Sequence, residues 1–260
     1  MKKQLSLVIL LGLLLSLTSV NSFADYQVEI SAALGTADLE TPGGDEDGDL
    51  IGLFAEFNFL PIDTGRGPLA EASFLTQSSL IQVSHVELDF DNGDSDTTVL
   101  AGRIVTDNGF IVEASYQEVL DADTISIGLG TYLTDELDLV VSFSDSNDND
   151  TSTLSAAVHG LTPLSGGATL AYDVTLGYVD ADSDNGTEIG GGITFYPSNN
   201  LGLSASYNRV SVDNGDVDTL SLGVDYFISE AFRVGASFQT VDLGSNLDID
   251  VMLINGAYRF

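Results

Sequence analysis

The sequence contains no cysteine and no tryptophan, and its seven lysines and arginines face 40 acidic residues. The absence of cysteine excludes a disulfide framework and a lipid-anchored cysteine. A net charge of −33 leaves no basic footprint for phosphates, so binding of nucleic acid is excluded as a main role. Beyond residue 24 no apolar run has the length of a membrane-spanning helix, which excludes a helical membrane protein.

The first 24 residues have the pattern of a secretory signal peptide. Lys2 and Lys3 are followed by the apolar run 5–17 and by the small-x-small site 22–24. A transmembrane anchor is the alternative, but the run is shorter than the roughly 20 residues that a spanning helix needs. Removal of this segment takes away both lysines and leaves 40 acids against five arginines, a net charge of −35.

The remaining chain, 25–260, repeats one theme of an alternating segment followed by a short connection. Between Leu137 and Phe143, for example, apolar residues occupy every second position. A period of two turns apolar side chains to lipid and polar ones to a lumen. The sequence therefore predicts an all-β fold, a transmembrane antiparallel up-and-down β-barrel with about fourteen strands, with twelve to sixteen as alternatives. The expected strands are 26–34, 50–60, 69–90, 97–105, 110–119, 124–133, 137–144, 151–162, 168–179, 188–196, 201–212, 218–227, 232–241 and 247–260.

The connections alternate in kind, which supports strands that run up and down. One set is compact and holds five acids: 61–68, 106–109, 134–136, 163–167, 197–200 and 228–231. The other set holds twenty acids: 35–49, 91–96, 120–123, 145–150, 180–187, 213–217 and 242–246. Short turns are expected on the periplasmic side and longer acidic loops outside, with 35–49 the longest.

Two local features qualify this pattern. Tyr132, Tyr196 and Tyr226 lie just before compact turns, which favours an aromatic belt at the membrane interface. The segment 69–90 is longer than the roughly 9–11 residues of a spanning strand. A bulge, a strand that extends beyond the membrane, or a hidden turn at 77–79 that would give fifteen strands could each explain its length.

Metal and catalytic motifs are incomplete. Asp180, Asp182 and Asp184 have the spacing of an EF-hand, but Asn185 occupies the glycine position and Gly191 the position of the bidentate glutamate. We therefore interpret the acidic connections as solvated loops, with loose binding of divalent cations at these three residues as a weak alternative. No cofactor is expected.

The two histidines, His85 and His159, lie in expected strands and outside any nucleophile motif. Ser155 and His159 share a face, but a separation of four residues in a strand is roughly 13 Å, too far for a nucleophile and its base. The sequence therefore predicts no enzyme, and a lumen or rim position for the histidines.

The faces opposite the apolar ones would line the lumen. Small Ser, Thr, Gly, Gln and Asn side chains dominate these faces, and fourteen strands with such residues should leave an open pore. An excess of acids over arginines should favour cations over anions; alternatively, some acids pair with the arginines and are structural. The expected charged pore-lining residues are Glu56, Glu71, Arg103, Glu113, Asp138, Asp173, Asp225 and Arg233.

The end of the chain carries a family resemblance. Ile254, Gly256, Tyr258 and Phe260 share one strand face, and the chain stops at the last of them. This resembles the closing strand of Gram-negative outer-membrane barrels, and the pattern of 25–260 as a whole resembles the small acidic porins of these bacteria. The resemblance implies an outer-membrane location, passive diffusion of small hydrophilic solutes, contact with lipid and lipopolysaccharide, and recognition of Tyr258 and Phe260 by the barrel-assembly machinery.

The resemblance also implies a homotrimer, but one feature departs from general porins. These porins fold a long third loop into the barrel, whereas the third acidic connection here is only 120–123. A monomeric, open pore is therefore the alternative to a trimer. Two other classes compete with a porin: a non-conducting barrel with a structural or adhesive surface role, and a secreted calcium-binding β-sandwich.

Overall fold

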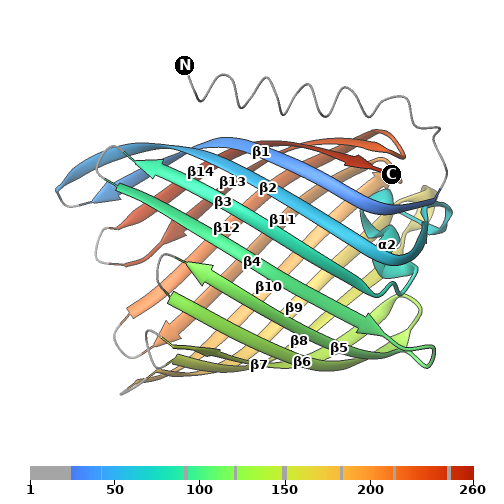
Figure 1. Cartoon of the computed structure of the whole chain (residues 1–260), viewed down its shortest axis with the longest axis horizontal. Helices are drawn as coiled ribbons and strands as arrows, with labels where there is room; N and C mark the ends of the chain where they lie inside the picture. The colour runs from blue at the N-terminus through green and yellow to red at the C-terminus, as the bar shows by residue number, and fades with distance from the viewer. Residues whose placement is uncertain are drawn as a thin grey trace.

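Fourteen antiparallel strands form one closed barrel, in which each strand pairs with its neighbours in sequence and β14 pairs with β1 (Figure 1). The computed structural model describes residues 25–41, 43–90, 93–119, 122–147, 151–181, 184–212, 215–244 and 247–260. The signal peptide expected over 1–24 lies outside them and stays a prediction. The predicted barrel of fourteen strands is confirmed, and the β-sandwich is excluded.

The strands are β1 (Asp25–Thr41), β2 (Gly44–Asp63), β3 (Leu80–Phe90), β4 (Gly93–Val105), β5 (Phe110–Val119), β6 (Ala122–Thr134), β7 (Leu137–Ser146), β8 (Thr151–Pro163), β9 (Thr169–Ala181), β10 (Asp184–Ser198), β11 (Leu201–Val212), β12 (Gly215–Ser229), β13 (Phe232–Asp242) and β14 (Asp248–Arg259). A short 3₁₀ helix, η3 (Ser165–Gly167), lies between β8 and β9.

The last strand closes the barrel. Ile30 of β1 is in register with Tyr258 of β14. The pairing continues to the final residue, because the backbone N–H of Phe260 donates to the carbonyl of Val28 at 2.9 Å and its carbonyl accepts from the N–H of Val28 at 2.9 Å. A closed ring leaves no sheet edge, which is what a β-structure in lipid requires.

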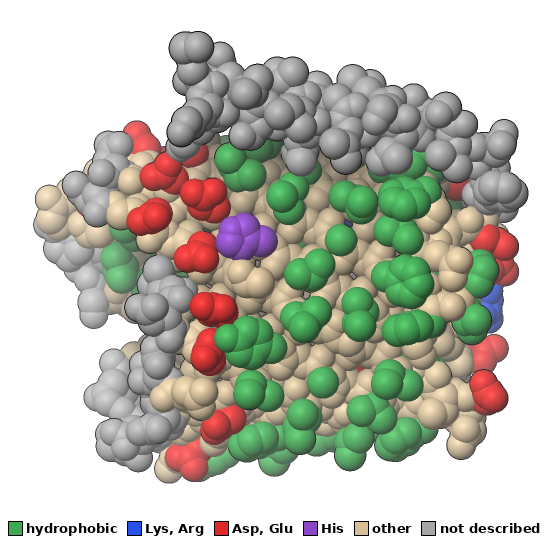
Figure 2. All heavy atoms as spheres, in the orientation of Figure 1, with side chains coloured by type: hydrophobic (Ala, Val, Ile, Leu, Met, Phe, Trp, Pro, Cys, Tyr) green, Lys and Arg blue, Asp and Glu red, His purple; other side chains and the backbone are tan. Residues whose placement is uncertain are grey.

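The outside of the barrel carries a broad apolar band (Figure 2). Large apolar side chains that are exposed come from all fourteen strands, among them Leu100, Ile127, Leu176 and Ile254. In water such a continuous apolar surface would be unfavourable, whereas in a bilayer it is the lipid-facing surface. Among the described residues, no helix is long and apolar enough to cross a membrane.

Strand pairing continues beyond this band at the end that carries most of the acids, here called the acidic end. On β3, Ile81 and Val83 face out, and the next outward residues towards this end are His85, Glu87 and Asp89. Figure 2 shows the acidic side chains beside the apolar band. The long loop expected over 35–49 is therefore wrong: β1 and β2 stay paired as far as Thr41 and Gly44, because outward acids alternate with inward residues and suit a strand in water.

The other end of the barrel, here called the turn end, has the one long connection between described strands. Residues 64–79, here called the internal segment, join β2 to β3 and contain the helices η1 (Thr64–Arg66), η2 (Leu69–Glu71) and α2 (Ala72–Leu75). The strand expected over 69–90 is thus wrong for 69–79, and only 80–90 form β3. Figure 1 shows α2 at the turn end of the barrel.

Candidate functional site

The internal segment leaves the wall of the barrel because its sequence favours short helices over a strand. The carboxylate of Asp63 accepts a hydrogen bond from the N–H of Gly65 at 2.9 Å and caps η1. Pro68 has no backbone N–H to donate to a strand partner, and it immediately precedes η2. The guanidinium of Arg66 donates to the carbonyl of Leu75, so the two ends of the helical part are tied together.

Contacts with distant strands place the internal segment across the lumen. Leu75 packs in a buried cluster with Leu161 of β8, Ala171 of β9 and Tyr196 of β10. On the opposite side, Arg259 of β14 donates to the carbonyl of Leu69 at 2.9 Å. Since β8 and β14 are separated by nearly half the barrel, the segment narrows the turn end of the lumen. The lumen at this end is therefore narrower than the small inward residues of the strands alone would leave it, and an open conducting pore stays a prediction.

Glu71 is the charged residue that the internal segment presents to the wall. One carboxylate oxygen accepts from the hydroxyl of Tyr196 at 2.7 Å, and the other lies 3.2 Å from Nε2 of His159. Nδ1 of His159 lies 2.6 Å from the carboxylate of Asp173. The imidazole also stands edge-on to the ring of Phe74, at 4.3 Å between centroids. Residues from η2, α2, β8, β9 and β10 thus meet in one polar cluster, here called the histidine cluster.

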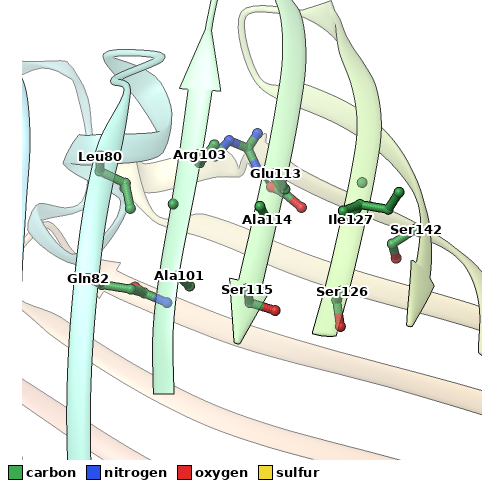
Figure 3. Close-up of a pocket in the computed structure, with 12 residues that line it drawn as sticks. Leu80, Gln82, Ala101, Arg103, Glu113, Ala114, Ser115, Ser126, Ile127 and Ser142 are labelled. Carbon is green, nitrogen blue, oxygen red and sulfur yellow. Dashed lines mark hydrogen bonds and ion pairs between the residues drawn. The ribbon is translucent and has the colours of Figure 1, made fainter. Parts of the chain in front are cut away.

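A second charged cluster lies on the wall of β4, β5 and β7. The guanidinium of Arg103 donates to Glu113 at 2.6 Å and to Asp138. Asp138 is almost fully buried, with a side chain that is 3% exposed, and it also accepts from the backbone N–H of His159 at 3.3 Å. Arg103 and Glu113 line a cavity of about 390 Å³ together with Ser115 and other small polar residues (Figure 3).

A third cluster lies where the barrel closes. Arg233 of β13 donates to Glu29 of β1 at 3.0 Å and to Asp225 of β12 at 3.3 Å. Arg259 also binds Glu29 and stacks over Tyr26, with 4.4 Å from the guanidinium to the ring centroid. A cavity of about 310 Å³ lies between Glu29, Arg233 and Glu56, among other residues.

Seven of the eight expected pore-lining residues lie in these three clusters. The eighth, Glu56, lies beside the third cluster, where it lines the cavity with Glu29 and Arg233 and accepts from Asn58 at 2.8 Å. Glu71 was expected on a strand, but it lies on η2, because the chain leaves the wall at residue 64. That these eight side chains line a conducting path stays a prediction. The expected pairing of Arg103 and Arg233 with acids is present.

Sequence reasoning missed the residues that hold the internal segment. Tyr132 and Tyr196 were assigned to an interfacial belt, but both face inward: Tyr132 donates to the carbonyl of Phe74 at 3.0 Å and Tyr196 donates to Glu71. Only Tyr226 of the three is outward, at 49% exposed. The alternation of the strand could have shown the direction of Tyr132. Side chains an even number of residues apart share one face of a strand, and Tyr132 is four residues from Gly128, which faces inward.

The remaining predicted positions lie away from the lumen. His85 is on the outer face of β3 and pairs with the hydroxyl of Thr98 at 2.9 Å. Of the weak metal candidates, Asp180 is described and exposed, whereas Asp182 and the side chain of Asp184 lie outside the described residues. Among the residues that are described, no group of three or more His, Cys, Asp or Glu side chains is arranged so that it could hold a metal ion.

A closed barrel with an apolar outside and a charged, hydroxyl-rich inside defines a transmembrane β-barrel of the outer-membrane class. The family model described as "Putative general bacterial porin" matches residues 1–184, and the chain belongs to this family. The protein is therefore a porin-family barrel of the Gram-negative outer membrane, in contact with its lipid, and its family and fold are those of a channel.

Two solved structures are similar to this chain in fold. The outer membrane protein Omp33 of Acinetobacter baumannii is 21% identical, aligns over 92% of this chain and 100% of its own, and gives a TM-score of 0.68. OccK7 (OpdD) of Pseudomonas aeruginosa is 9% identical, aligns over 91% of this chain and 99% of its own, and gives a TM-score of 0.50. At these identities the similarity extends to the fold. Curated protein sequences contain no match.

Proposed function

We propose that the barrel is a diffusion channel for small hydrophilic solutes with a preference for cations. The observation that carries this proposal is the charge of the inward side chains. Among the described residues of the three clusters and their surroundings, eight acids face three arginines and His159: Glu29, Glu56, Glu71, Glu113, Asp138, Asp173, Glu188 and Asp225 against Arg103, Arg233 and Arg259.

This excess acts where water is confined. Fields are stronger between low-dielectric walls than in bulk water, so a net negative constriction raises the local concentration of cations. Small inward side chains support a water-filled route along β5–β8, where Ser142 and Ser155 hydrogen-bond across the strands at 2.9 Å. Such hydroxyls suit hydrated solutes rather than apolar ones.

Reconstitution into planar bilayers tests the proposal, with a reversal potential measured across a KCl gradient. We expect the sign that corresponds to selective passage of K⁺. Glu56→Gln should weaken this selectivity, because the carboxylate lies beside a lumen cavity. Glu87→Gln is the matched control: it removes the same charge from the outer face of the neighbouring strand and should leave the reversal potential unchanged. An anion-selective wild type would overturn the cation preference.

A non-conducting barrel with a structural or adhesive surface role is the second candidate. The internal segment favours it, because residues 64–79 occupy part of the lumen at the turn end. Bilayer conductance separates the two candidates. Step-like currents from purified protein support the channel, and their complete absence in correctly folded protein would support the alternative.

The proposed setting has the turn end in the periplasm and the acidic end facing lipopolysaccharide. The proposed state is a monomer, supported by the apolar band that all fourteen strands share, and we expect barrel assembly to use the terminal strand with Tyr258 and Phe260. Light scattering on detergent-purified protein tests the oligomeric state, and a mass of three chains would replace the monomer by the trimer.

A further inference from the structure

We infer that the internal segment is a movable constriction, and that His159 latches it to the wall through Glu71 in a pH-dependent way. This inference rests on the proposed channel function and assigns its regulation. It begins with the hydrogen bonds of the imidazole, whose two ring nitrogens each lie within bonding distance of a carboxylate: Asp173 at 2.6 Å and Glu71 at 3.2 Å.

The number of N–H donors on the imidazole makes this arrangement sensitive to the protonation of His159. A carboxylate only accepts, a neutral imidazole has one N–H, and an imidazolium has two. Both contacts are therefore hydrogen bonds only when His159 is protonated. Loss of one proton turns one ring nitrogen into an acceptor that faces a carboxylate, so a charge-assisted bond becomes a repulsive contact.

The groups around His159 leave few substitutes for the lost donor. Tyr196 on β10 already donates to Glu71. Asp138 on β7 faces the backbone of His159 and is bound by Arg103 of β4, so this cation is engaged elsewhere. On the internal segment, the ring of Phe74 stands edge-on to the imidazole and offers no hydrogen bond.

The internal segment has three structural features that are expected of a segment able to move. Its three helices have only three or four residues each, too short for independent stability. Gln77, just after α2, is the one non-glycine residue with positive φ among those described, at 54°. Such a left-handed backbone conformation is strained for a residue with a side chain and often marks switch regions. The hydroxyl of Thr76 is buried and has no hydrogen-bond partner among the residues that the structure describes.

The latch connects protonation to the size of the pore. With imidazolium present, Glu71 is held at the wall and the segment stays across the lumen. With neutral imidazole, the contact between η2 and β8 weakens. The segment is then held by the apolar packing of Leu75 and by hydrogen bonds from the side chains of Tyr132, Tyr196 and Arg259. We expect the ratio of wide to narrow states to rise roughly tenfold, the shift that corresponds to losing one charge-assisted hydrogen bond.

The test is permeation of a neutral sugar into liposomes that contain the full-length mature protein, over a pH series from about 5 to about 11, wide enough for an imidazole that lies between two carboxylates. Because a neutral solute is neither attracted nor repelled by the charges of the lumen, its permeation reports the width of the pore and not the change in lumen charge with pH. We expect permeation to rise with pH in the wild type, and His159→Gln to abolish this dependence. His85→Gln is the control, since His85 is the only other histidine and lies outside the barrel.

A second set of variants works independently of histidine chemistry. The side chains of Ser73 and Asn58 meet at 3.0 Å between the internal segment and β2, and the chain has no native cysteine. In Ser73→Cys/Asn58→Cys, the disulfide should abolish the pH response and a reductant should restore it. Asp173→Asn should move the midpoint to lower pH, because the imidazolium loses one of its two carboxylates.

The outcomes separate the latch from the channel. The latch is overturned if permeation through the wild type does not change with pH. It is also overturned if the pH response persists in His159→Gln and in the oxidised double-cysteine variant. Neither outcome contradicts the proposed channel function. Absence of permeation and of ion current in every variant, including a deletion of 66–78 bridged by glycines, overturns the channel function itself.

Discussion

Replacing Arg103 by glutamine should destabilise the barrel strongly, because one guanidinium neutralises two carboxylates. Arg103 binds Glu113 and Asp138, and the side chain of Asp138 is only 3% exposed. Breaking a buried ion pair by removing one partner costs about 3–5 kcal/mol. Arg103 and Glu113 are 21% and 34% exposed to the lumen, so solvent screens part of this loss and we expect about 2–3 kcal/mol in the free energy of unfolding.

A double-mutant cycle isolates the electrostatic part. Arg103→Gln/Asp138→Asn removes the stranded carboxylate together with its partner and should recover stability to within about 1 kcal/mol of the wild type. Arg103→Lys should lie between the two, because a lysine cannot bind both acids with a rigid fork. Unfolding by urea in lipid vesicles, followed by far-UV circular dichroism and gel mobility, suits a chain without tryptophan. A double variant as unstable as Arg103→Gln would refute this reasoning.

Three further outcomes follow from the register of the strands. Gly130→Ala should cost about 1–3 kcal/mol, because a Cβ there would collide with the carbonyl of Leu139, whereas Gly102→Ala meets only ordinary contacts and serves as its control in urea unfolding. Glu87→Gln should stabilise the barrel by about 0.2–1 kcal/mol at low salt, since an acid of β4 lies directly opposite, and high salt should remove the gain. Phe260→Ala should lower the folded fraction in outer membranes, measured by heat-modifiable gel migration; an unchanged fraction would contradict the assembly role of this residue.

The barrel itself was predictable because its determinants are local. Alternation such as that between Leu137 and Phe143 fixes a strand and its lipid face without any distant contact. The extent of the strands was less predictable. Acids near residues 38–49 suggested a loop by composition, but the structure pairs them in a strand and turns acids such as Asp38 and Asp47 outward at register-matched positions. Composition alone does not distinguish a solvated loop from a strand in water.

The internal segment was not predictable in the same way, because its local pattern is ambiguous. Ala70, Ala72 and Phe74 are two residues apart, which suggests a strand, while Ala72 and Leu75 are three apart, which suits one face of a helical turn. The choice is made by contacts distant in sequence, such as that of Glu71 with a histidine 88 residues away. Secondary-structure signals of a few residues cannot outweigh such tertiary contacts.

The barrel wall and the width of its lumen therefore depend on different residues. The lipid face and the closure by β14 follow from the period of two and the register of the strands. The width of the lumen instead depends on whether Glu71 and Leu75 stay against the wall, and so on a few side chains of β6, β8, β10 and β14. We expect replacement of those side chains to leave the same fourteen strands and to change the range of solutes that permeate in the liposome assay, the result that would make solute selection a property of the internal segment rather than of the strand number.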